Sequence, residues 1–512
     1  MSGYLRRLAT TGAAYTAASI LSKLIAVALL PLYTRYLTPA DYGAAEVLFA
    51  AVVAASIVVR LGVIEAVLRF YYKSGEDPAR VLSTSFAALF WLATAAALVA
   101  LPFAEPISEA LNDPGADLVR ISIGGLWVLT LHEYLLTIFR LEERARAFFA
   151  VTIANVLAAI ALTVALVVGA DEGARGLLLG SYASGAVFVL GLIVVHRRRI
   201  SLRVDRPLLR RMMRFGLPTM PAELSLYMLN FVDRIIIVRA AGFAEAGLYS
   251  LAVKFAQAVN VLVRGFQLAW PPLAYSIRDD NEARRAYARV VTYFIAACAF
   301  VVTGMWLLSR WIARALAAPE FFASYEAVGL ISTAVTLYAL YMVQVVILGR
   351  TGRTELNLPA TIAALVANVV LNLVLVPPLG IVGAGVALVA SYLVVVAAMY
   401  GFTQRLFPVP YEWGRLARVV LVSAVLVALG ELLLPTEGFA GLAGRLALLL
   451  AYPLALLASG FFSREERRTL ARLRHPGELL ASYRALRDRQ PEVDGRVPEA
   501  YEAEIRDEDA RL

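Results

Sequence analysis

The chain has little of what metal, redox and nucleotide chemistry requires. Its one cysteine, Cys298, lies in an apolar run, so neither a disulfide framework nor a thiolate metal site can form. Its three histidines are far apart, with no His-x-x-x-His pair, which argues against a zinc or redox-metal centre. The pattern Gly-x-x-x-x-Gly-Lys-Ser/Thr does not occur, so we expect no P-loop ATP hydrolysis and no cofactor.

Charge is also scarce. Of the 512 residues only 17% are charged and 60% are apolar, with a mean hydropathy of +0.71. A soluble domain is about a quarter charged and nearer half apolar, so a soluble globular protein is excluded. Apart from a charged C-terminal segment, no polar stretch reaches the ~100 residues of a catalytic domain. We therefore expect a non-enzymatic protein that works inside the membrane.

Apolar runs of about 20 residues between polar breaks predict an all-α polytopic membrane protein. Fourteen such runs can be placed along the chain. They lie near 12–34, 43–63, 81–103, 118–139, 147–169, 175–195, 215–238, 244–271, 287–308, 325–348, 357–377, 381–402, 415–434 and 442–462.

The distribution of cations predicts the orientation of these spans. With the N-terminus inside, the inner loops carry 25 Lys and Arg residues and the outer loops carry 7. The positive-inside rule then places both termini in the cytoplasm and the protein in the cytoplasmic membrane. Eight arginines gather between 197 and 214, and from Ser463 onward 11 basic residues face 12 acidic ones. The net charge of +9 therefore arises from basic residues in the predicted cytoplasmic loops, and nucleic acid is not an expected partner.

The two halves of the chain resemble each other at an offset of 204. Residues 35–43 align with 239–247, Gly12 with Gly216, and Arg60 with Arg264. Chance matching in a chain so rich in Ala, Leu and Val is the alternative. Parallel repeats of six helices are transporter architecture, with a substrate site between them near the midplane. We expect an N-lobe (1–196), a basic linker (197–214), a C-lobe (215–404), two added helices (405–462) and a charged cytoplasmic tail (463–512).

Two lysines lie where lipid is expected. Only three of the 48 basic residues are lysines, and two of these, Lys23 and Lys254, fall inside predicted spans. At 1.5 Å per residue they lie ~16 Å and ~15 Å into their helices, near the middle of a ~30 Å core. Snorkelling to an interface is hardest at that depth. We therefore predict that both lysines face a water-filled cavity and bind substrate.

Arg60 and Arg264 are matched by the repeat and lie near the cytoplasmic ends of their spans. They are candidates for substrate binding, and ordinary interfacial anchoring is the alternative.

Four further charged residues within spans are candidates for ion coupling or cavity charge. Glu223 follows Pro218 and Pro221, and it either carries a proton or neutralises a lysine. Asp233 and Arg234 are adjacent, so their side chains point about 100° apart, and a role in helix contact is favoured over substrate contact. Glu133 follows His132, and the pair is either a proton relay or two polar side chains whose hydrogen bonds are satisfied within the protein.

Ammonium groups in a wet cleft suit an anionic ligand, above all phosphate. A lipid with a diphosphate head cannot cross a bilayer unaided, because the head would have to be dehydrated. A cationic cleft open to lipid would solve that problem.

With these residues in view, the chain resembles the Wzx-type oligosaccharide-lipid flippases of the multidrug/oligosaccharidyl-lipid/polysaccharide exporter superfamily. The segments that carry the resemblance are LYTRYLTPADYG (32–43), FGLP (215–218), NFVDR (230–234), Gly247-Leu248-Tyr249 and NLVLVPPLGIVGA (372–384). In the last region, Leu379 and Leu388 depart from the aromatic residue and the threonine that are common there.

The resemblance implies a V-shaped, MATE-like fold of two six-helix lobes with a cationic central cavity. It also implies alternating access and transfer of undecaprenyl-diphosphate-linked oligosaccharide from the inner to the outer leaflet. Proton or Na+ coupling and contacts with other polysaccharide-assembly membrane proteins would fit that activity. The competing hypotheses are a multidrug exporter of the same fold and a membrane-embedded polysaccharide polymerase or ligase.

The charged tail divides into two parts. Residues 464–489 are basic with a partial leucine stripe, which is typical of a segment lying on anionic headgroups. Residues 490–512 are acidic and poor in large apolar groups, which predicts a solvated tail.

Overall fold

The computed structural model describes residues 21, 25, 27–73, 75–463 and 466. Lys23 and nearly all of the charged tail lie outside these residues. Within them every regular element is a helix.

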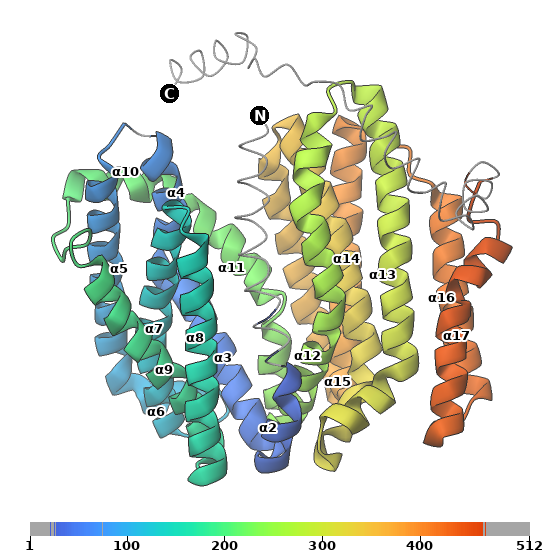
Figure 1. Ribbon diagram of the computed structural model, residues 1–512, viewed down its shortest axis with the longest axis horizontal. Coiled ribbons are helices and arrows are strands. Elements are labelled where there is room, and N and C mark those ends of the chain that lie inside the picture. The colour runs from blue at the N-terminus through green and yellow to red at the C-terminus, as the bar shows by residue number, and fades with distance from the viewer. Residues whose placement is uncertain (1–20, 22–24, 26, 74, 464–465, 467–512) are drawn as a thin grey trace.

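Two groups of helices stand side by side in Figure 1. They approach each other at the lower end, around α2, α3 and α12, and diverge toward the upper end, where α4 and α10 lie. The first group contains α3 (Pro39–Arg60), α4 (Val63–Lys73), α5 (Pro78–Ala100), α6 (Ala104–Ala110), α7 (Ala116–Leu141), α8 (Ala145–Val164) and α9 (Gly173–His196). The second contains α12 (Val232–Ser276), α13 (Asp280–Leu316), α14 (Tyr325–Thr351) and α15 (Asn357–Leu406).

The remaining helices join or flank these two lobes. Between the lobes lie α2 (Leu30–Tyr36) at the lower end and α11 (Met220–Met228), while α16 and α17 stand beside α13 at the edge of the molecule (Figure 1). Their bounds, with those of the short helices, are α10 (Arg206–Gly216), α16 (Trp413–Leu433), α17 (Gly438–Ala458), η1 (Leu101–Phe103), η2 (Ala165–Gly169), η3 (Leu217–Thr219), η4 (Pro319–Ser324) and η5 (Thr354–Leu356).

Eleven helices among the described residues are long and apolar enough to cross a membrane. The predicted number is fourteen, and that count is not established. The first predicted span lies largely outside the described residues, and the seventh is divided among α10, η3, α11 and the start of α12. Helix α15 contains two predicted spans and α12 contains the end of the seventh span and the whole of the eighth, and in each helix the two parts are joined at a glycine with positive φ.

The break in α12 falls at Gly242, whose backbone angles (φ 88°, ψ 177°) are not helical. Asp233 lies before the break and accepts a hydrogen bond from the Tyr249 hydroxyl after it. In a straight helix these two residues would be ~24 Å apart. The chain therefore reverses at Gly242. In α15, Pro377 and Pro378 precede a similar break at Gly380 (φ 54°, ψ −134°).

The predicted basic linker contains a helix that packs on the first lobe. Asp205 caps α10 by accepting a hydrogen bond from the Leu208 amide at 3.1 Å. Leu208 and Met212 are fully buried in a cluster that also holds residues of α4 and α5. At the end of α10, Gly216 lies so close to Gly62 that a Cβ on Gly62 would be 1.9 Å from the Gly216 carbonyl oxygen.

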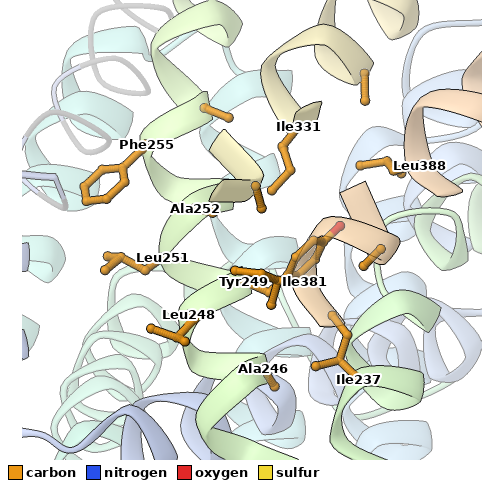
Figure 2. Close-up of a cluster of buried hydrophobic side chains, with 14 of the residues drawn as sticks. Ile237, Ala246, Leu248, Tyr249, Leu251, Ala252, Phe255, Ile331, Ile381 and Leu388 are labelled. Carbon is orange, nitrogen blue, oxygen red and sulfur yellow. The ribbon is translucent and has the colours of Figure 1, made fainter. Parts of the chain in front are cut away.

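A single hydrophobic cluster continues from one lobe into the other. It includes Tyr42 and Leu48 of α3, Leu178 of α9 and Phe255 of α12. Figure 2 shows the part where α12, α14 and α15 meet, with Tyr249, Ile331 and Ile381 among the labelled side chains.

The outer surface of the bundle is apolar as well. More than half of the surface of large apolar side chains is exposed at positions on α5, α9, α16 and α17, among them Leu98, Val187, Leu432 and Leu450. Patches of this kind mark contact with membrane or a partner, and on helices of this length and hydropathy they mark contact with lipid.

Candidate functional site

The lobes touch directly where α3 and α12 cross at the lower end of the molecule. A Cβ on Gly43 would lie 1.9 Å from the Phe243 carbonyl oxygen, and one on Gly247 would lie 2.1 Å from the Pro39 carbonyl oxygen. Pro39 and Phe243, like Gly43 and Gly247, are 204 residues apart. The contact is therefore symmetric in the register of the sequence repeat, and glycine is required on both sides because the two backbones meet.

Lys254 lies on the same interface. Its Nζ is 2.5 Å from Oε1 of Glu46 on α3 and 5.2 Å from the centre of the Tyr42 ring. The Lys254 and Glu46 side chains are 31% and 15% exposed. Lys254 thus points at the opposite lobe and is paired with a carboxylate. The sequence shows Glu46 as an acidic residue within a span but does not predict its pairing with Lys254, although Glu46 follows Gly43 by one helical turn and so shares its face.

The face of α12 that carries Lys254 becomes exposed immediately above it. Ala258, Val261 and Gly265 follow Lys254 at helical spacing, and all three are exposed. Since Lys254 itself faces α3, this face of α12 points toward the first lobe and leaves the contact within about one turn. This agrees with the divergence of the lobes toward the upper end in Figure 1.

A second charged group lies nearer the predicted cytoplasmic side, on α3, α7 and α11. The Arg60 guanidinium of α3 pairs with Glu133 of α7, and its Nη2 is 3.2 Å from Oε1 of Glu223 on α11. Arg60 is 12% exposed in its side chain, against 37% and 40% for the two glutamates. Glu223 therefore neutralises an arginine rather than a lysine, and the group has one cation for two carboxylates.

Asp233 and Arg234 contribute to the hairpin within α12. The buried Asp233 carboxylate accepts hydrogen bonds from Tyr249 and from the Arg234 amide, while Arg234 Nε lies 3.3 Å from the Ser250 hydroxyl. Arg234 also donates to the Asn230 carbonyl oxygen. Both side chains reach Tyr249 or Ser250, and their contacts join the halves of α12 on either side of Gly242.

The remaining predicted site residues are not joined to these groups. Arg264 is exposed on α12, ten residues beyond Lys254. Lys23 falls outside the described residues. Of the four predicted substrate-binding cations, the structure thus places Lys254 and Arg60 at contacts of the first lobe with α12 or α11.

Sequence reasoning missed a buried ionic cluster that fastens the last two helices to the C-lobe. Arg445 of α17 is fully buried and donates to the Leu307 carbonyl oxygen of α13 and to Glu431 of α16. Arg310 of α13 lies 3.4 Å from the same glutamate. Glu431 and Arg445 lie inside the predicted spans near 415–434 and 442–462, and charges within spans are the signal that could have located this cluster.

An apolar cavity of about 820 Å3 lies between α13, α14, α15 and α16. Leu337, Val396, Trp413 and Val420 are among its lining residues, with Gln344 as one of the few polar ones. None of the described residues that line it is charged, so it is suited to apolar chains and not to a phosphate.

Solved structures of known transporters share this fold. The chain superposes on the lipid II flippase MurJ in its inward closed conformation with a TM-score of 0.71, at 14% identity, over 88% of this chain and 99% of that one. It superposes on an inward-facing MATE multidrug resistance transporter with a TM-score of 0.62, at 16% identity, over 79% and 96% of the two chains. The chain therefore has a MATE-like, all-helical fold.

Residues 32–295, just over half of the chain, match the family described as polysaccharide biosynthesis protein, and the chain belongs to that family. The succinoglycan biosynthesis transport protein ExoT of Rhizobium meliloti (strain 1021) is 25% identical over 317 residues. This match covers 59% of the chain and spans about three fifths (61%) of the length of that relative. ExoT is named a transport protein and MurJ a flippase.

Proposed function

We propose that this protein is a flippase for undecaprenyl-diphosphate-linked oligosaccharide in surface polysaccharide biosynthesis. The lipid would pass from the inner to the outer leaflet of the cytoplasmic membrane by alternating access between the two lobes. The observation that carries the proposal is the placement of the Lys254 ammonium between the lobes, beside the face of α12 that is exposed from Ala258 upward.

Electrostatics supports an anionic substrate at this position. Moving a diphosphate from water into hydrocarbon is prohibitively costly, whereas an ammonium in a polar gap replaces part of the lost hydration. The flexible stem of lysine lets the charge follow the moving headgroup, which a rigid guanidinium fork does less well. Lys23, predicted at similar depth in the first span, would supply a second cation.

We assign earlier and auxiliary steps to the other candidates. Arg60 and Arg264, toward the predicted cytoplasmic side, would receive the headgroup first. Glu133 and Glu223 share the single Arg60 cation, and this excess of carboxylate suits a coupling proton or Na+. Both termini would lie in the cytoplasm.

The same excess of carboxylate favours one alternative, export of cationic drugs by the same fold. A drug exporter would select cations at the Arg60 group, and Lys254 would serve only as a structural partner of Glu46. The two functions differ in the sign of the charge that the protein moves.

Purified protein in vesicles tests the proposal directly. Wild-type protein should move a fluorescent lipid-linked oligosaccharide between leaflets without ATP, and Lys254→Ala should slow it about ten- to a hundredfold, because a charge-assisted contact contributes ~1.5–3 kcal/mol. Arg405→Ala, which removes an exposed cation at the end of α15, is the matched control and should keep the wild-type rate. Vesicles that move cationic dyes but no lipid-linked sugar would establish the drug exporter instead.

A further inference from the structure

The Lys254 ammonium already has an anionic partner. Glu46 lies 2.5 Å from it, and Tyr42 presents its ring to the same ammonium. Among the ion pairs of the described residues, this is the one that joins α3 directly to α12. The group that we propose to bind phosphate is thus occupied by a carboxylate of the opposite lobe.

The ion pair is next to the backbone contact of the lobes. Glu46 follows Gly43 by three residues and Lys254 follows Gly247 by seven, so both lie within two helical turns of the glycines and on the same faces. Any motion that separates α3 from α12 at the lower end has to break the contact between Glu46 and Lys254. The pair therefore contributes to holding that end of the interface closed.

Simultaneous contact of a phosphate and the Glu46 carboxylate with the Lys254 ammonium is unfavourable. An anion that reaches the ammonium would be within a few ångströms of the Glu46 carboxylate, and like charges at that distance repel strongly in a poorly solvated site. Binding of the headgroup therefore requires Glu46 to move away. Its departure removes the ionic contact between α3 and α12.

We propose that Glu46 is an internal stand-in for the substrate phosphate. Its displacement couples headgroup binding to the opening of the lower end, which is the predicted outer end because Arg60 lies near the cytoplasmic end of α3. In the empty transporter Glu46 neutralises Lys254 and keeps the lobes together. The diphosphate takes its place, and α3 is released from α12. This inference rests on the proposed function and names the residue that regulates the same site.

The exchange also makes Glu46 a determinant of specificity. A diphosphate diester carries two negative charges and gains attraction when it replaces the single charge of a carboxylate. A phospholipid with one negative charge gains none, so it does not displace Glu46. A ligand shifts a conformational equilibrium only by its difference in affinity for the two states, and Glu46 supplies that difference for doubly charged heads.

The test compares two substitutions that break the same ion pair. Binding of a short-chain prenyl diphosphate and of a short-chain phosphatidylglycerol, whose phosphodiester carries one negative charge, is measured on purified full-length protein in detergent. Glu46→Gln should tighten diphosphate binding about tenfold and narrow the preference over the phosphodiester, because the competitor is gone. Lys254→Gln should weaken diphosphate binding about tenfold or more. A purely structural ion pair would make both variants bind more weakly.

Hydrogen exchange in the same samples reports whether the contact between α3 and α12 opens. Backbone amides in residues 39–47 and 243–252 should exchange faster in wild-type protein with diphosphate, and already without ligand in Glu46→Gln. Glu46→Asp keeps the charge and should retain the wild-type preference for diphosphate. It also serves as the second variant if Glu46→Gln does not fold.

The outcomes separate the two proposals. If wild-type protein moves lipid-linked sugar in vesicles while Glu46→Gln leaves both affinity and exchange unchanged, the role of Glu46 is wrong and the flippase stands. If neither the wild type nor Glu46→Gln binds prenyl diphosphate, and vesicles move cationic dyes only, the flippase itself is wrong.

Discussion

The two ends of the interface between the lobes are built differently. At the lower end, α3 and α12 meet backbone to backbone at Gly43 and Gly247, and the charges there are balanced one to one. Toward the upper end, the corresponding glycine contact, between Gly62 and Gly216, joins the first lobe to α10, and one arginine faces two carboxylates.

The difference shows which end is closed. At the lower end α3 and α12 touch backbone to backbone, so motion there requires breaking a packed contact. At the upper end α11 lies between them, touching α3 through the Tyr227 hydroxyl, which donates to the Ala50 carbonyl oxygen at 2.9 Å. A helix that contacts both lobes allows their upper ends to move apart while it remains attached to each.

The largest effect is expected at the lower contact. Gly43→Ala places a methyl group 1.9 Å from the Phe243 carbonyl oxygen, and backbone on both sides leaves no side chain to move away. Overpacking of this kind costs about 1–3 kcal/mol. We expect a lower melting temperature in detergent, faster hydrogen exchange in α3 and α12, and loss of transport.

Gly124→Ala is the matched control, because nothing lies within 4 Å of a Cβ at this position in α7. It should be neutral or slightly stabilising, since alanine is the better helix former. Equal melting temperatures for the two variants would mean that the lobes do not meet at Gly43.

A smaller effect is expected at the upper group. Arg60→Ala leaves Glu133 and Glu223 without their cation, but both carboxylates are more than a third exposed and water can screen them. Removing one partner of a fully buried pair costs about 3–5 kcal/mol, and we expect about 1–2 kcal/mol here. Thermal unfolding of detergent-solubilised protein measures it.

Arg60→Lys keeps the charge but cannot contact both carboxylates in the geometry of a guanidinium. Its thermal stability should therefore lie between those of the wild type and Arg60→Ala. High salt should reduce the stability loss caused by Arg60→Ala and leave the stability loss caused by Gly43→Ala unchanged, since only the former is electrostatic. An unaltered melting temperature in Arg60→Ala would show that the upper group does not hold the lobe to α11.

The smallest effect is expected at the cap of α10. Hydrogen bonds from the Leu208 amide and the Arg80 guanidinium hold the pKa of Asp205 below its ordinary value of 3.8. A carboxylate with a lowered pKa contributes stability that is complete above the ordinary value and is lost as the pH falls through the lower one. Wild-type protein should therefore protect residues 206–216 from hydrogen exchange better than Asp205→Ala at pH 7. A protection difference that stays the same at acid pH would contradict this assignment.

Much of the fold could be predicted from the sequence because hydrophobic length is a local property. The predicted spans near 43–63, 118–139 and 175–195 correspond to α3, α7 and α9. The glycines at 43 and 247 were visible as a repeat, though not as a contact. The seventh span was predicted as one helix and is divided. Pro218 and Pro221 stand at the starts of η3 and α11, and a second break at residues 229–231 separates α11 from α12.

The candidate site was only partly predictable. Depth along a helix follows from counting residues, and this is how Lys254 was found. Its pairing with Glu46 joins residues 208 positions apart, and no local pattern reports such a distance. The same holds for Arg60, Glu133 and Glu223, which come from three helices.

Composition and periodicity by themselves determined that this is a helical membrane protein, since a bilayer accepts only segments that satisfy their own backbone hydrogen bonds. Which charges meet, which end of the lobes is closed and what occupies Lys254 were decided by the tertiary structure alone. The reason is physical: an ion pair or a glycine contact depends on distances between helices, and those are set by the packing of the whole bundle.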